Sequence, residues 1–203
     1  MTRGRGCGCG CGGLLVVLLA VVAAGYFFVY RPVSSFVDGW RAPAQSAQLP
    51  KPSGNVNAPL TVPEVQAFVR VRRKEREALG NSFGSVQSLF RNIQDGQNVG
   101  VWQVVGTLRD VGNSLGQTRR AQVDALIKEQ LSRERYNAVA AGVNRSLGVP
   151  DIDFGRVASD IRSGKVPDIN TSVKTDADPR TTKLIEPFKT ELSATAALGL
   201  LGL

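Results

Sequence analysis

Five basic side chains fall within seven consecutive positions, and they are the residues of this sequence best suited to bind a ligand. They are Arg70, Arg72, Arg73, Lys74 and Arg76. Such a run can bind phosphates or anionic lipid headgroups, because each cation neutralises a negative charge. Glu75 and Glu77 interleave with it, however, and a solvated helix face of mixed charge has the same composition. Both interpretations stay open at this point.

The 203-residue chain contains no histidine. This excludes Ser-His-Asp and Cys-His catalysis, His-ligated metals and the commonest general base. A glycine loop of the nucleotide-binding type is also absent from the sequence. A Ser–Lys nucleophilic pair stays formally open, but no serine lies in a recognisable supporting motif. We therefore expect no enzymatic activity and no cofactor.

Carboxylates offer one remaining type of metal ligand. Asp151 and Asp153, and likewise Asp176 and Asp178, lie close enough in sequence to suggest a metal site. Each pair precedes an expected helix, so N-capping explains both pairs more simply. We predict no metal site from them.

Three cysteines, Cys7, Cys9 and Cys11, alternate with glycine just before an apolar segment. A lipoprotein signal is excluded, because its cysteine must follow the apolar segment. Metal binding by thiolates, reversible acylation and a plain run of small residues at a membrane entrance stay open. The last of these requires no further chemistry, so we again predict no metal site.

Residues 14–30 carry no charge and read LLVVLLAVVAAGYFFVY. At about 1.5 Å of rise per residue, a helix of this length roughly matches the hydrocarbon core of a bilayer. Four aromatic residues occupy its end at residues 26–30, where such rings favour the headgroup boundary, and Arg31-Pro32 closes it. The pattern predicts a single transmembrane helix over 14–30, after a Cys/Gly/Arg-rich tail at 1–13, with the lipid bilayer as its partner.

The residues that flank this segment indicate its orientation in the membrane and whether it is cleaved. Arg3 and Arg5 form a short basic tail, which favours a cytoplasmic N-terminus and an extracytoplasmic location for residues 31–203. A cleaved secretory signal is the alternative, with small residues before Gly25 as the cut site near Ala24. Against it, cleavage there would leave a strongly apolar new N-terminus at residues 26–30.

Residues 31–59 form a Pro-rich linker, which predicts an extended tether that holds the following domain away from the bilayer. Half of the net charge of +8 belongs to residues 1–58. The domain at residues 60–203 is therefore only mildly basic, and we expect no nucleic acid partner.

The domain begins with a clear helix start. Thr61 and Glu64 have the spacing of a capping box. Leu60 and Val65 occupy the positions of a hydrophobic staple, which fixes the direction of the entering chain. The helix is expected to run to about Leu79.

Apolar residues at helical spacing mark the next helices, on either side of a turn-like segment at 95–98. One stripe contains Val86, Leu89, Phe90 and Ile93, and the other contains Val101, Val104, Val105, Leu108, Val111 and Leu115. Glycines within the second stripe predict close helix contact or a kink near Gly116.

Further cap signals place the remaining helices. Ser132 caps a helix that ends at Gly148, Asp153 caps a short one, and Asp178 opens a last helix that includes the apolar tail 196–203. No alternating strand pattern is present. We predict an all-α fold, with an antiparallel bundle of roughly five to six helices after the transmembrane helix and the tether.

The helix starts at residues 60–72, LTVPEVQAFVRVR, and 131–136, LSRERY, resemble helix openings in uncharacterised membrane-anchored bacterial envelope proteins. The second departs from that pattern at Asn137 and Ala138, where an aromatic residue often follows the tyrosine. The resemblance implies a bacterial envelope setting and no particular activity. We therefore expect an envelope interaction or scaffold module with an unidentified protein partner. The alternatives are a membrane-adjacent binder of anionic lipid or polymer and a secreted helical protein.

Overall fold

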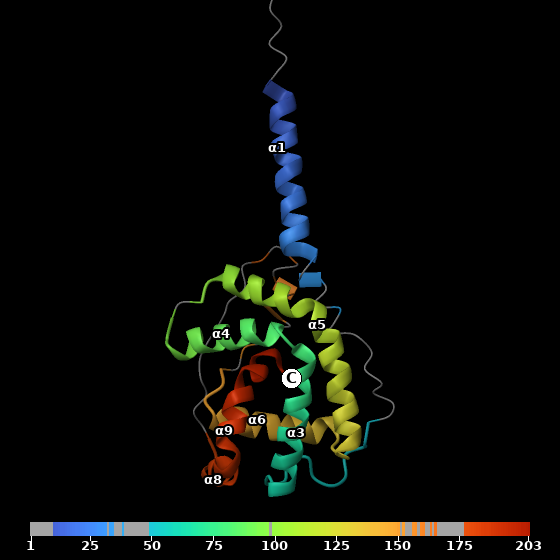
Figure 1. Cartoon of the computed structure of the whole chain (residues 1–203), viewed down its shortest axis with the longest axis vertical. Helices are drawn as coiled ribbons and strands as arrows, with labels where there is room; N and C mark the ends of the chain where they lie inside the picture. Colours follow the sequence, from blue (N-terminus) through green and yellow to red (C-terminus); the bar gives the residue numbers. More distant parts are fainter. Residues whose placement is uncertain are drawn as a thin grey trace, which may run out of the picture.

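The computed structural model describes residues 10–31, 33–34, 38, 49–97, 99–150, 152, 156–157, 159–160, 163, 165 and 177–203. Over these residues the protein is all-α, as the sequence predicts, and contains no strand. A helical domain occupies one end of the molecule, and a single apolar helix projects from it along the longest axis (Figure 1).

The projecting helix consists of α1 (Gly10–Gly25), which continues without a break into the π-helix η1 (Tyr26–Tyr30). It begins earlier than predicted and changes from α to π geometry at the first aromatic residue. No single helix within the described part of the chain is long and apolar enough to cross a membrane.

The described part of the domain is a bundle of helices whose axes cross one another rather than run uniformly antiparallel (Figure 1). The first part holds α3 (Val62–Leu79), α4 (Ser82–Gln94) and α5 (Val101–Lys128), followed by α6 (Arg133–Ser146). The last part holds α8 (Pro179–Ile185), η3 (Glu186–Phe188), α9 (Lys189–Thr195) and η4 (Ala196–Leu201). The second half of α5 packs along α3. In the view of Figure 1, α6 crosses α3, and α4 runs away from the end of α3 at a steep angle.

The helix starts predicted at Thr61, Ser132 and Asp178 are confirmed, whereas Asp153 lies outside the described residues. The Thr61 backbone N–H donates to Oε2 of Glu64 over 2.9 Å at the start of α3. Ser132 Oγ accepts from the Arg135 backbone N–H at 3.2 Å in α6. Asp178 accepts from two backbone N–H groups of α8. Each cap satisfies donors that have no partner within the first turn of the helix.

Helix α5 contributes to two separate cores. Leu108 and Leu115 in its first half pack with α4 and η4, whereas Ala125 and Leu126 in its second half pack with α3 and α6. The helix changes direction between its two halves (Figure 1). The Thr118 hydroxyl donates back to the Ser114 carbonyl, a bond that bends helices. The predicted kink in this region is thus observed, and a Cβ at Gly116 would meet open space rather than a neighbouring helix.

The apolar C-terminal tail folds back into its own domain. The prediction of one continuous last helix is wrong, because Pro187 interrupts it with the 3-10 turn η3. Beyond α9, η4 inserts Leu198, Leu200 and Leu201 into the core, where none of them is exposed. Leu203 is also buried.

Both described ends of the predicted tether pack against the domain. Val33, three residues beyond η1, is 1% exposed and belongs to the core around α4 and the first half of α5. Leu49 packs against the second core. Val33 and Leu49 are thus held by the domain, while most residues between them lie outside the described part of the chain. The extended tether over 31–59 stays a prediction.

Candidate functional site

The five predicted binding residues do not share one surface. Arg72 lies in the core with 2% exposure, with its guanidinium 4.8 Å from the centre of the Phe68 ring. Glu75, expected on a solvated face, is completely buried. The helix face that carries these two residues therefore belongs to the interior and cannot contribute to an anionic-surface site.

The other four basic side chains are on the surface, and each already has a contact within the domain. Arg70 pairs with Glu129 at 2.6 Å, and Lys74 pairs with Glu77 at 2.7 Å. Arg73 pairs with Glu191 of α9. The Arg76 guanidinium lies 5.0 Å from the centre of the Phe83 ring. These contacts neutralise much of the positive charge that the sequence pattern suggests.

Three of these residues nevertheless line a shallow groove between α3 and the second half of α5. It has a volume of about 460 Å³, with Ala121 and Ala125 among its lining residues. Its charged lining is mixed and consists of Arg70, Arg73, Lys74, Glu77, Asp124, Lys128 and Glu129. Such a surface favours a partner that itself carries both signs of charge over a simple polyanion.

The buried Glu75 carboxylate joins three helices. Its Oε1 accepts from Gln122 Nε2 at 2.6 Å and from the Tyr136 hydroxyl at 2.8 Å. Its Oε2 lies 3.8 Å from Arg72 Nε. Burial, together with the Glu75 charge, raises the pKa of Tyr136 well above its ordinary value. The phenol therefore stays protonated and serves as a fixed hydrogen-bond donor.

Arg119 extends this network towards the C-terminus. Its Nη1 donates to Gln122 Oε1 at 3.0 Å. Burial lowers the pKa of Arg119 to about 10, and the negative charge of Glu75 opposes that shift. Arg72 and Glu75 are buried, and the half-buried Arg119 extends the ionic cluster that they form, whose charges are stabilised by one another and by neighbouring dipoles.

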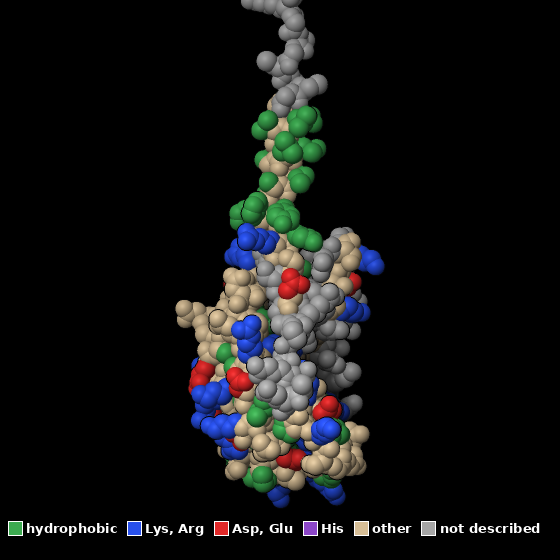
Figure 2. All heavy atoms as spheres, turned by 90° about the vertical axis from the view of Figure 1, so that its right-hand side faces the viewer, with side chains coloured by type: hydrophobic (Ala, Val, Ile, Leu, Met, Phe, Trp, Pro, Cys, Tyr) green, Lys and Arg blue, Asp and Glu red, His purple; other side chains and the backbone are tan. Residues whose placement is uncertain are grey.

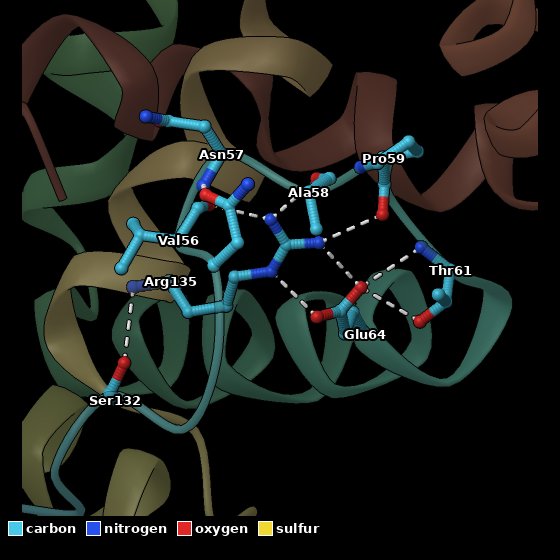
Figure 3. A network of polar contacts seen from close by, with 9 residues as sticks. Val56, Asn57, Ala58, Pro59, Thr61, Glu64, Ser132 and Arg135 are labelled. Atoms are coloured by element: carbon cyan, nitrogen blue, oxygen red, sulfur yellow. Dashed lines mark hydrogen bonds and ion pairs between the residues drawn. The ribbon is translucent and has the colours of Figure 1, made fainter.

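A second network fixes the chain that enters α3 (Figure 3). Arg135 Nε pairs with Glu64 Oε1 at 2.6 Å, and its two Nη atoms donate to backbone carbonyls of residues 56, 58 and 59. Glu64 also accepts from the Thr61 hydroxyl at 2.7 Å. Hydrogen bonding to Arg135 lowers the pKa of Glu64 to about 2. One guanidinium thus connects α6, α3 and the segment before α3.

An open pocket of about 370 Å³ lies beside this network. Its walls come from residues 51–59, the start of α3 and the loop between α5 and α6. Gln130 in that loop has a φ of 53°, a backbone conformation that is uncommon outside glycine. Glu64 and Arg135, which both line this pocket, form an ion pair with each other. The pocket therefore presents few unpaired charges to a ligand.

The other chemical candidates fall mostly outside the described residues. This is the case for Asp151, Asp153, Asp176 and the side chains of all three cysteines. Asp178 is described, and its carboxylate accepts the backbone N–H groups of Arg180 and Thr181. Within the part of the chain that the structure covers, no group of three or more Cys, Asp or Glu residues could hold a metal ion.

The most conspicuous surface is the apolar helix α1. Every described side chain between residues 13 and 28 is exposed, including Leu14 at 70% and Phe28 at 65%. Green hydrophobic side chains surround its visible face, with blue Lys and Arg side chains directly below them (Figure 2). One residue missed in the sequence is Trp102 in the first turn of α5, which is 76% exposed. It lies beside the apolar stripe of residues 101–115 in the sequence, and only the tertiary structure reveals its exposure.

Comparisons with known proteins add no functional assignment. No family model matches the chain, and neither the curated proteins nor the solved structures compared with it gave a match.

Proposed function

We propose that this protein is a single-pass membrane-anchored helical domain that acts as an interaction or scaffold module at the bilayer surface. Residues 14–30 contact lipid, the N-terminus is cytoplasmic, and residues 31–203 lie on the extracytoplasmic side of a bacterial envelope. The basic N-terminal tail supports this orientation. The domain meets a protein partner through its exposed surface.

The exposed apolar surface of the helix from Gly10 to Tyr30 carries this proposal. At about 1.5 Å per residue, α1 and η1 together extend roughly 30 Å, which is close to the thickness of a hydrocarbon core. Each apolar Å² left in water costs about 25 cal/mol, so such a helix requires apolar surroundings. Tyr26 stacks on Tyr30 with ring centres 5.5 Å apart, at the end where aromatic residues favour the interface.

Fractionation of the full-length chain tests the anchor. The protein should remain in the membrane pellet after an alkaline wash, and N-terminal sequencing should show no cut after Ala24. Leu18→Arg should weaken membrane retention, because a central arginine costs about 3 kcal/mol in an inserting helix. Leu18→Ile is the matched control. A mature chain that starts at Gly25 and washes off would instead identify a secreted helical protein.

A single-cysteine reporter tests the orientation. The only cysteines are at positions 7, 9 and 11, so replacing them with serine gives a cysteine-free background. Thr182→Cys then places one thiol at an exposed position of α8. A membrane-impermeant maleimide should label it in intact cells. Labelling only after lysis would place the domain in the cytoplasm and would leave the anchor itself intact.

A binder of anionic polymer or lipid is the second candidate function, and the groove lined by Arg70, Arg73 and Lys74 favours it. The ion pairs within that groove favour the scaffold instead. Charge reversal at Arg70, Arg73, Lys74 and Arg76 separates the two functions. A scaffold should retain its crosslinked partner, whereas an anion binder should lose its ligand and show steep salt dependence. Reversal of four exposed cations outside the groove, Arg91, Arg120, Arg180 and Lys183, makes the same change in net charge and is the control.

A further inference from the structure

We propose that the outer face of the first half of α5 lies against the bilayer surface, with Trp102 in the interfacial region and Arg109 beside anionic lipid headgroups. This inference rests on the anchor proposed above. It adds a second, peripheral membrane contact that would fix the orientation of the domain.

Trp102 is the first observation that supports this contact. Outside α1 and η1, Trp102 and Val62 are the large hydrophobic side chains exposed among the described residues, at 76% and 44%. Exposing an indole to water is unfavourable, whereas the boundary between headgroups and acyl chains suits its apolar ring and polar N–H. A surface tryptophan at this position is therefore better accommodated by lipid than by water.

The helical spacing places Trp102 and Arg109 on one face. Trp102, Gly106, Arg109 and Asn113 follow each other at intervals of four, three and four residues. Such intervals keep side chains on one face of a helix. The buried side chains of the same helix half occupy the opposite face and pack with α4 and η4. They are Val104, Leu108, Val111 and Leu115.

The position of α5 in the molecule supplies the second observation. The first half of α5 lies at the end of the domain from which α1 projects, and α4 lies farther from α1 (Figure 1). Val33 belongs to the same core cluster as Val104 and Leu108. The core lies on the side of α5 that faces away from α1. The opposite face of α5, which carries Trp102 and Arg109, therefore points towards the end of the domain where η1 meets it.

The charge on this face suits an anionic surface. The Arg109 side chain is 55% exposed, and its Nε lies 3.6 Å from Oδ1 of Asp110. Asp110 is itself directed towards α4, because its Oδ2 accepts a 2.7 Å hydrogen bond from the Ser85 hydroxyl. Arg31 is also exposed, at the end of η1. Blue side chains gather below the apolar helix in Figure 2, at the level where headgroups would lie.

Quenching by brominated lipids tests the contact in the full-length protein. Trp40→Phe leaves Trp102 as the only tryptophan. The protein is reconstituted in vesicles of phosphatidylcholine and phosphatidylglycerol, with or without bromine on the acyl chains. A matched reporter carries Trp40→Phe, Trp102→Phe and Thr182→Trp, which moves the fluorophore to α8 at the opposite end of the domain. We expect several-fold stronger quenching of Trp102 than of the Thr182→Trp reporter.

Sedimentation of the same vesicles after an alkaline wash separates the two proposals. Retained protein with no quenching of Trp102, or with equal quenching of both reporters, overturns the contact and leaves the anchor standing. Loss of the protein from the vesicles overturns the anchor and this inference together.

Two glycine substitutions test whether the face of α5 with Trp102 and Arg109 contacts the bilayer, and neither of them removes a packed side chain. A Cβ at Gly106 or at Gly84 would meet open space. Gly106→Glu adds a negative charge between Trp102 and Arg109 and should reduce the quenching of Trp102, most clearly in vesicles rich in phosphatidylglycerol. Gly84→Glu makes the same change in α4 and should leave the quenching unchanged. Equal quenching in both variants would contradict the proposed contact.

Discussion

The hydroxyl of Tyr136 donates a hydrogen bond of 2.8 Å to the carboxylate of Glu75, and both side chains are buried although the two residues lie 61 positions apart in the chain. Gln122 of α5 donates to the same oxygen. The carboxylate therefore fixes the mutual positions of α3, α5 and α6. A buried charge has this effect only while all of its donors remain, because each donor offsets part of its desolvation.

Tyr136→Phe should lower the free energy of unfolding by about 1–3 kcal/mol, since it leaves a buried carboxylate with one fewer donor. The phenyl ring keeps its packing against Phe68, whose ring centre lies 5.2 Å away. Urea unfolding of the full-length chain in mild detergent measures the change. Asn137→Ala, at the exposed neighbouring position, is the control. Equal stability of Tyr136→Phe and the parent would show that the hydroxyl is dispensable.

Gly199→Ala should destabilise the docking of the C-terminal tail by about 1–3 kcal/mol through overpacking. A Cβ there would lie 2.9 Å from the side-chain amide of Asn144, whose Oδ1 also accepts from Arg72 at 3.4 Å. Gly106→Ala is the contrasting variant, because its Cβ meets open space in α5. It should stabilise the domain by up to about 1 kcal/mol. Thermal unfolding of both variants gives the comparison, and a shift in the same direction for both would contradict it.

Arg135→Gln should release the chain segment that precedes α3. Arg135 donates to carbonyls of Val56, Ala58 and Pro59 as well as to Glu64. Glutamine lacks the charge and the forked geometry that make these contacts simultaneously. Hydrogen exchange of residues 55–60 should become faster in the variant, while exchange in α5 stays slow. Unchanged exchange at 55–60 would mean that other contacts hold this segment.

The Glu64–Arg135 pair also predicts a dependence of stability on pH. The pKa of Glu64 is lowered from 4.5 to about 2 in the folded protein. Its ionised form therefore stabilises the fold above pH 4.5, and this contribution decreases as the pH falls from 4.5 towards 2. The difference in unfolding free energy between the parent and Glu64→Gln should shrink over that range. A constant difference would show that the ionisation of Glu64 does not contribute.

Local signals predicted much of the fold. The caps at Thr61, Ser132 and Asp178 depend on side chains within three residues of the helix start, so a sequence reveals them directly. The apolar stripe at Val86, Leu89, Phe90 and Ile93 is likewise buried as expected. The interruption of the last helix was also readable, because Pro187 cannot continue it.

Which residues of the predicted binding site are exposed depends on tertiary contacts, and these cannot be inferred from the local sequence pattern. Glu75 lies within the basic run, yet it is buried because Tyr136 and Gln122 provide hydrogen-bond donors from distant segments. Arg72 is buried against the Phe68 ring and donates to Asn144 of α6. Trp102 is the opposite case. It lies next to a core-facing stripe, but the crossing of α4 beneath α5 leaves it on the outer surface. Burial of a side chain near the edge of a stripe is decided by which helix packs there.

Val33 gives the molecule a mechanical property. The chain is helical through Arg31, and Val33 is already held in the domain core. The end of the apolar helix therefore lies within two residues of a side chain held in the domain core. In a protein anchored through that helix, rotation about the helix axis would turn the whole domain with it. Torque applied to the helix in the bilayer would thus be transmitted to the domain, whereas a flexible linker would not transmit it.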